Sequence, residues 1–210
     1  MPRWIGEDIP VPFSVAQEAS QRLADGNWAG LPITREALDV LQNYHESIAD
    51  AGVMPSPECL TVEQHERLFI LNYPGGSRLN RTIGMIVTAM LTAKSGYKIG
   101  FQFDPYRIIL DVPARTTVKD LLAILKGFVP EVSSLLRFAI KDSPSLKPQL
   151  LHSARKMGAI APDADIGKFG MKKLMEAYSD TPLYTEAVER FLFHQLDENG
   201  MEKFIHQINS

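Results

Sequence analysis

The sequence predicts an α+β fold, in which a small antiparallel sheet is covered by helices and followed by a C-terminal helical bundle. Apolar and polar residues alternate in "YKIGFQF" (97–103) and "YRIILDV" (106–112), as in the two strands of a hairpin. The apolar stretch "RLFILNY" (67–73) supplies a third strand. We treat residues 1–210 as a single composite domain, with a mixed part over about 1–115 and a helical part over about 116–210.

The mixed part begins with two expected helices. The first covers 13–23, and the second begins at the N-cap Thr34. A third helix over 77–93 follows the strand 67–73 after the break "PGGS", and Gly84 permits its close packing. Its buried stripe is formed by Leu79, Ile83, Ile86, Val87 and Met90.

The hairpin is expected to have an inner and an outer face. Asp104 and Pro105 lie between its strands, and the alternation places Tyr106 inward, in the core. Arg107 then faces the other way, where it is free to bind a phosphate or an acidic partner. The helical part follows, with expected helices over 117–127, 130–141, 146–157, 167–178, 183–195 and 199–208.

Composition excludes several classes of site. The chain of 210 residues is 45% hydrophobic, which is ample for a core, and its single cysteine excludes an internal disulfide framework. The five histidines never fall at a metal-ligand spacing, so we expect neither a metal nor a cofactor. No signal peptide or membrane-spanning apolar run is visible, so we expect a soluble, cytoplasmic chain with no membrane contact.

The net charge of −3 conceals a strong asymmetry along the chain. Residues 1–66 carry three basic and eleven acidic side chains, residues 67–175 carry seventeen and seven, and residues 176–210 carry two and seven. The segments therefore have net charges of −8, +10 and −5. A basic middle segment suits a polyanionic partner, and the alternative is a set of solvated charges on an ordinary surface.

The stretch "PGGSRLN" (74–80) resembles a phosphate-binding loop only in part. It lacks the lysine of a Walker A loop and the spaced glycines of a dinucleotide fingerprint. What remains is a modest anion site. It has Ser77 as N-cap, free amides in the first helical turn, and Arg78 and Arg81 on one face. Alternatively, these arginines are solvated or pair with Glu63 and Glu66.

Four stretches together resemble a known family: "WIGEDIPVPF" (4–13), "YPGGSRLNRTIGMIVTAML" (73–91), "DPYRIIL" (104–110) and "YSDTPLYTEAVERFLFHQLD" (178–197). They are similar to the DEAD/H-associated domain, which follows the RecA-like motors and the winged helix in large helicase-related (Lhr) proteins. The resemblance implies a parent that is an ATP-dependent helicase, translocating 3′ to 5′ on single-stranded DNA and unwinding RNA:DNA hybrids among other duplexes. It also implies contacts with the motor and winged-helix domains, and we expect a fragment or a separately encoded equivalent of such a helicase.

The resemblance also implies roles for individual residues. Trp4 matches a tryptophan that stacks on nucleobases, although a tryptophan here could also fill a gap between the sheet and the first helix. Arg78, Asn80 and Arg81 match an Arg-x-Asn helix start, whose polar groups are expected to contact phosphates or the motor domains.

A second basic region lies in the helical part, where Arg155 and Lys156 end an expected helix. The alternative explanation is ordinary cationic charge at a helix C-terminus. The nucleic-acid-binding candidates are therefore Trp4, Arg78, Asn80, Arg81, Arg107, Arg155 and Lys156. Two functions remain open: an accessory domain that grips single strands, and a docking module without nucleic-acid contact.

The chain has neither a Walker A sequence nor an Asp-Glu-x-His box, so it lacks the groups that hold nucleotide phosphates and Mg²⁺. We therefore expect the purified chain to hydrolyse no ATP, with or without DNA. A phosphate-release assay checks this, and turnover abolished by a substitution within this chain would contradict it.

Overall fold

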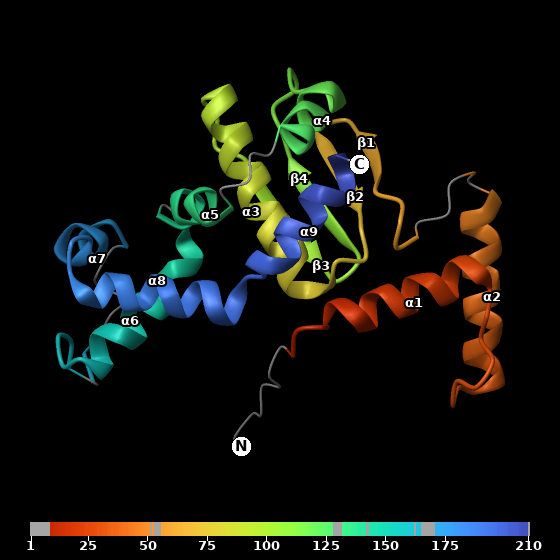
Figure 1. Ribbon diagram of the computed structural model, residues 1–210, viewed down its shortest axis with the longest axis horizontal. Coiled ribbons are helices and arrows are strands. Elements are labelled where there is room, and N and C mark those ends of the chain that lie inside the picture. The colour runs from red at the N-terminus through yellow and green to blue at the C-terminus, as the bar shows by residue number, and fades with distance from the viewer. Residues whose placement is uncertain are drawn as a thin grey trace.

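The computed structural model describes residues 9–50, 52, 56–127, 132–141, 143–161, 163–164 and 171–209. Within these ranges a four-stranded antiparallel sheet is combined with helices before and after it, which confirms the predicted α+β class (Figure 1). In the same ranges, no helix combines the length and the apolar composition needed to cross a membrane.

Two N-terminal helices form a projection at one end of the molecule, which we call the arm (residues 13–50; Figure 1, red and orange). Its helices are α1 (Phe13–Asp25) and α2 (Arg35–Asp50), close to the expected positions. The hydroxyl of Thr34 accepts a 3.3 Å hydrogen bond from the amide of Ala37, which confirms the predicted N-cap.

The sheet has the strand order β1-β2-β4-β3, and every neighbouring pair is antiparallel. The strands are β1 (Thr61–His65), β2 (Leu68–Asn72), β3 (Gly100–Asp104) and β4 (Arg107–Asp111). β2, β3 and β4 are the three expected strands, whereas β1 was not predicted. Its sequence "TVEQH" is mostly polar because this short edge strand is largely exposed, so it carries no alternating apolar signal.

The prediction that Tyr106 lies in the core is wrong. Asp104 pairs with Arg107, so Pro105 and Tyr106 form the two-residue turn between β3 and β4. Side chains alternate between faces only within a strand, and the Tyr106 side chain in the turn is 44% exposed.

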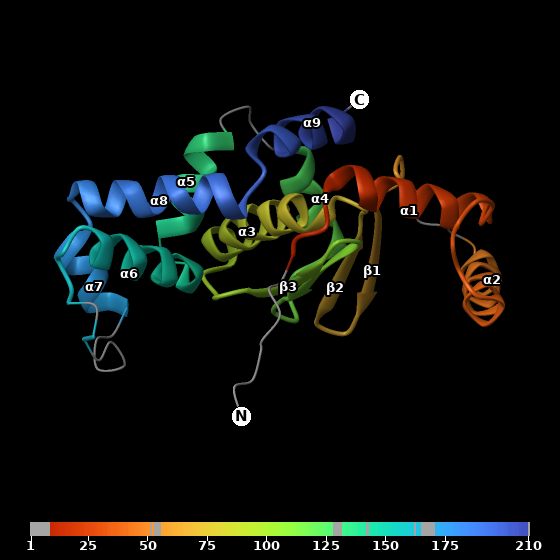
Figure 2. The same cartoon turned by 90° about the horizontal axis from the view of Figure 1, so that it is seen from below.

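Helix α3 (Gly76–Ser95) lies along one face of the sheet, and the described helices leave most of the opposite face open (Figure 2). Four residues of the expected stripe are buried and Met90 is half-buried. A Cβ at Gly84 would lie 2.4 Å from the ring of Phe101, so the predicted close packing is confirmed. A side chain here would push the helix away from the sheet.

The helical part contains α4 (Val118–Lys126), α5 (Val132–Lys141), the short 3-10 helix η1 (Pro144–Leu146), α6 (Lys147–Lys156), α7 (Met171–Tyr178), α8 (Pro182–Gln195) and α9 (Glu198–Asn209). All six expected helices are present, with described bounds within a few residues of the predicted ones, and the expected helical residues 167–170 lie outside the described residues. α9 returns to pack on α3 and α4, as Figure 1 shows. The buried residues of the sheet and of these helices form one cluster that includes Phe69, Ile83, Leu136 and Phe204. The two parts thus share a core.

The start of α3 also holds the segment that leads into α1. The amide of Ser77 donates to the carbonyl of Val11 (3.0 Å), and the amide of Val11 donates to the Ser77 hydroxyl (2.9 Å). Gly76 has a φ of +72°, and a Cβ at this position would lie 2.8 Å from the Val11 carbonyl oxygen. Only glycine fits both this conformation and this approach.

We expect Gly76→Ala to destabilise the fold more than a matched change elsewhere. Gly158 has a φ of +73° with nothing within 4 Å of an added Cβ, so Gly158→Ala should cost only the left-handed conformation, about 1–2 kcal/mol. Gly76→Ala should add an overpacking cost of about 1–3 kcal/mol. Urea unfolding of both variants measures this difference, and equal losses of stability would contradict the packing of Val11 against Gly76.

Candidate nucleic-acid interface

The first turn of α3 is not the open anion site that the sequence suggested. Its N-cap is Gly75 and not Ser77, and no side chain caps the helix. The amide of Gly76 donates to the carbonyl of Pro105 (2.9 Å), and that of Ser77 donates to the carbonyl of Val11. The expectation of free amides is therefore wrong for these two, because the chain's own carbonyls occupy the positions that phosphate oxygens would take.

Arg78 joins α3 to the end of α8. Its Nη2 donates to the carbonyl oxygens of Phe193 and Leu196, and not to Glu63 or Glu66. Carbonyls at a helix C-terminus lack partners within the helix and carry partial negative charge, so a guanidinium stabilises them. Arg78 remains exposed at its surface, but its hydrogen-bonding groups serve the contact between the two helices.

Arg81 reaches the same end of α8 one turn later. Its Nη1 donates to Oε1 of Gln195, and its guanidinium lies 5.0 Å from the ring centre of Phe191 and 5.8 Å from that of Phe103. Burial lowers the pKa of Arg81 from its ordinary value, yet an arginine side chain keeps its charge in proteins. This half-buried cation therefore stabilises the packing of α3 on α8 and on β3.

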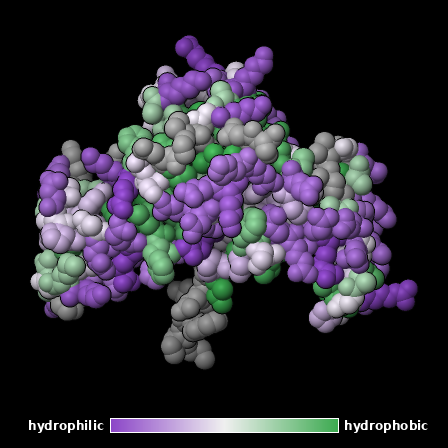
Figure 3. Space-filling view, viewed as in Figure 1, coloured by the Kyte–Doolittle hydropathy of each residue, from purple (hydrophilic) through white to green (hydrophobic). Residues whose placement is uncertain are grey.

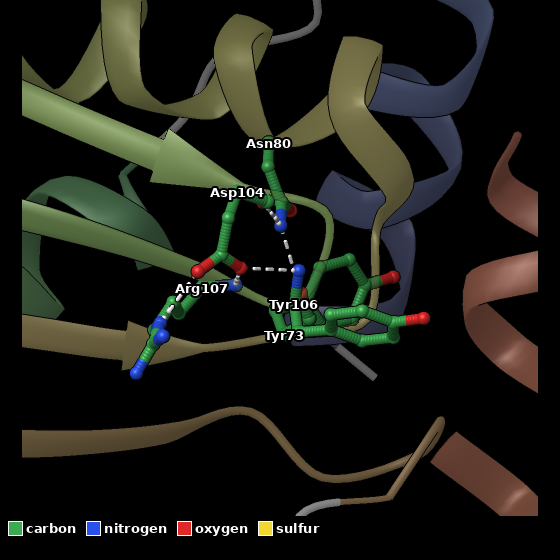
Figure 4. A network of polar contacts seen from close by, with 5 residues as sticks. All are labelled: Tyr73, Asn80, Asp104, Tyr106 and Arg107. Atoms are coloured by element: carbon green, nitrogen blue, oxygen red, sulfur yellow. Dashed lines mark hydrogen bonds and ion pairs between the residues drawn. The ribbon is translucent and has the colours of Figure 1, made fainter. Parts of the chain in front are cut away.

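Asn80 is completely buried between the end of β2 and the turn after β3 (Figure 4). Its Nδ2 donates to the carbonyls of Tyr73 and Asp104, each at 2.9 Å, while its buried Oδ1 has no hydrogen-bond partner among the described residues. With no exposed surface, the amide cannot contact a phosphate on the surface of this conformation. Its role here is to join two backbone segments that would otherwise leave carbonyls unpaired.

Arg107 lies at the start of β4, exposed and paired with Asp104 (Figure 4). Nε of Arg107 lies 2.5 Å from Oδ2 of Asp104, whose Oδ1 accepts hydrogen bonds from the amides of Tyr106 and Arg107 at 2.8 and 3.0 Å. Hydrogen bonding to Asp104, together with its charge, raises the pKa of Arg107. The positive charge is locally balanced, so Arg107 could bind a phosphate only in competition with Asp104.

Arg155 and Lys156 are the candidate cations whose side chains form neither a hydrogen bond nor an ion pair with any described residue. Both are exposed in the last turn of α6, and neither forms an ion pair with any residue that the structure describes.

Trp4, the expected stacking residue, lies outside the described residues. Among the described side chains, no group of histidine, cysteine, aspartate and glutamate is arranged to hold a metal ion.

Sequence patterns did not indicate which groups face α3 from the far end of the chain. The hydroxyl of Thr82 accepts a 2.9 Å hydrogen bond from the amide of Asp197, whose carboxylate in turn accepts the amide of Gly200 at 2.9 Å in α9. Residues 193–197 therefore receive Arg78, Arg81 and Thr82 together. Both segments lie within stretches that carried the family resemblance, but nothing in their spacing showed that they meet.

The candidates thus fall into three places. Arg78 and Arg81 lie between α3 and α8, Asn80 and Arg107 are linked through Asp104, and Arg155 with Lys156 stands apart on α6.

A comparison with solved structures finds a structure of the Mycobacterium smegmatis helicase Lhr bound to ssDNA and AMP-PNP, with a TM-score of 0.71 and 18% sequence identity. The match covers 99% of this chain and 30% of that chain, so this chain spans less than a third of the helicase. A search of curated proteins gives no match.

A family model described as DEAD/H associated matches residues 54–210, which are about three quarters of the chain. The matched region includes the sheet, α3, the α3–α8 contact and all of the helical part. The chain therefore belongs to the DEAD/H associated family.

Proposed function

We propose that the chain is an accessory domain of an Lhr-type ATP-dependent DNA helicase that translocates 3′ to 5′, and that it holds single-stranded nucleic acid while motors elsewhere hydrolyse ATP. The observation that carries the proposal is the pair of exposed cations at the end of α6, which form no ion pair with any described residue. The likeness in fold to a helicase solved with ssDNA supports it. In this proposal the substrate is single-stranded DNA or an RNA:DNA hybrid, and the neighbouring domains are RecA-like motors and a winged helix.

The proposed grip combines two kinds of contact. Arg155 and Lys156 bind backbone phosphates, with a contribution from Arg107 if phosphate displaces Asp104. Trp4 stacks on a base, which contributes without reading sequence. Arg78 and Arg81 act indirectly, because their hydrogen bonds hold α8 in place.

The binding of phosphates can be tested by salt dependence. Replacing Arg155 and Lys156 together by Gln should weaken binding to labelled oligo(dT) and flatten the slope of log K against log salt by about 0.7 for each phosphate that is no longer neutralised. Fluorescence anisotropy at several salt concentrations measures both quantities. The matched control is the double change of Lys119 and Lys126 to Gln, exposed cations on α4.

Trp4→Ala, measured in the same assay, should cost about 1–3 kcal/mol of binding free energy and leave the salt slope unchanged. The absence of binding at low salt would overturn the proposed function. If the double change of Lys119 and Lys126 on α4 weakened binding as much as the double change on α6, the proposed phosphate site on α6 would be wrong.

Arg78 should behave as a structural residue. Because Arg78→Ala leaves two carbonyls at the end of α8 without their charged donor, we expect a loss of about 1–3 kcal/mol in the free energy of unfolding. Arg115→Ala, at an exposed arginine without an ion pair among the described residues, should change it by less than about 0.5 kcal/mol. Urea unfolding measures both, and a neutral Arg78→Ala would contradict the structural role.

The second candidate is a protein-docking module with no nucleic-acid contact of its own. It is favoured by the large exposed side chains of Phe138 and Phe193, 62% and 74% exposed, in the helical part. Figure 3 shows hydrophobic patches between the hydrophilic side chains on that side of the molecule. Failure of the anisotropy test would favour this candidate.

A further inference from the structure

A groove of about 550 Å³ lies between the arm and the turn that joins β3 to β4; we call it the arm groove. Its walls are mainly apolar and include three aromatic side chains: Trp28 in the loop between α1 and α2, Tyr44 in α2, and Tyr106 in the turn. This size is typical of sites that bind ligands or side chains. Arg107 lines this groove, whereas Arg155 and Lys156 do not.

Helix α2, which forms one wall of the arm groove, is incompletely buried. None of the sixteen residues of this helix is buried, although Leu41, Tyr44 and Ile48 recur at helical spacing on the wall of the groove. Tyr44 is 55% exposed, and the neighbouring Val40 is 67% exposed. An amphipathic helix with its apolar side half in water has the composition of a helix that packs against a further segment.

Charge distinguishes the kinds of segment that could fill the groove. Its two arginines are already neutralised, since Arg22 pairs with Glu18 at 3.0 Å and Arg107 pairs with Asp104 at 2.5 Å. Residues 9–50 contain two arginines against six carboxylates, a net charge of −4. Lysines and arginines of a partner would be attracted to the acidic arm that forms one wall of the groove, whereas a phosphate could bind in the groove only by displacing Asp104 from Arg107.

We propose that the arm groove is a docking site for an amphipathic protein segment that carries a row of apolar side chains flanked by lysine or arginine. The apolar row fills the space between Trp28, Tyr44 and Tyr106 and completes the burial of α2. The flanking cations lie near the acidic side chains of the arm. This protein site is separate from the proposed phosphate contacts on α6, so either can fail without the other.

Trp28 provides a direct signal of occupancy. The chain has two tryptophans, so Trp4→Phe leaves Trp28, in the wall of the groove, as the single emitter. We would titrate this variant with an 18-residue helical peptide that has leucines on one face and lysines on the other. A twin peptide with glutamate in place of lysine tests the charge requirement, and an oligo(dT) strand tests nucleic acid.

We expect the lysine peptide to shift the Trp28 emission to shorter wavelengths and to bind at least tenfold more tightly than its glutamate twin. Tyr44→Ser should weaken this binding at least tenfold, because it removes an aromatic anchor from the groove. Tyr97→Ser is the matched control, since Tyr97 is 64% exposed and does not line the groove, and it should leave the affinity unchanged. Both tyrosines are exposed, so both variants should keep the circular dichroism of the parent.

Four results would overturn the proposal. They are equal binding of the two peptides, equal effects of Tyr44→Ser and Tyr97→Ser, a stronger response of Trp28 to oligo(dT) than to the lysine peptide, and self-association in sedimentation that Tyr44→Ser abolishes. The third would assign the groove to nucleic acid, and the fourth to a second copy of the chain.

Discussion

The contact between the first turns of α3 and the junction of α8 with α9 holds the two parts of the molecule in one arrangement. Arg78, Arg81 and Thr82 each bind groups in residues 193–197, through two carbonyls, an amide side chain and a backbone N–H. On its other side the same helix start receives Val11 and Pro105. A few residues around the N-terminus of α3 therefore position the arm, the sheet and the helical part. Each of these residues makes a hydrogen bond to a group that would otherwise lack a partner.

Because of this arrangement, several positive charges of the middle segment bind groups within the protein. Arg78 and Arg81 contribute to the positive charge of the middle segment, but their guanidinium groups serve internal contacts, and that of Arg107 is balanced by Asp104. A count of charges along the chain therefore overstates the positive charge that a ligand meets. The cations on α6, which have no ion-pair partner in the described part of the chain, favour anionic ligands, and the acidic arm favours cationic ones. This difference is the basis for separating a nucleic-acid contact from a protein contact.

Sequence patterns predicted the elements well, but not the contacts made at the start of α3. Helices and the central strands were predictable because burial on one face imposes a period of 3.6 or 2, whereas the polar edge strand β1 carries no such period. Ser77 and the first-turn amides had the chemistry of an anion site, but nothing local to them indicated that Val11 and Pro105 would occupy those amides. The role of Asn80 could not be predicted for the same reason. Its partners are backbone carbonyls, which every residue carries, so residue types do not reveal them.

The separation in sequence between the partners of α3 has a consequence for how the chain acquires its structure. Arg78 and Phe193 are 115 residues apart, as are Thr82 and Asp197, so closing this contact orders a very long loop. During synthesis, the hairpin and α3 are complete long before the carbonyls that Arg78 needs exist. The first half must therefore wait with part of its apolar surface uncovered until α8 and α9 emerge, and a chain that stops before residue 193 would keep that surface exposed to aggregation.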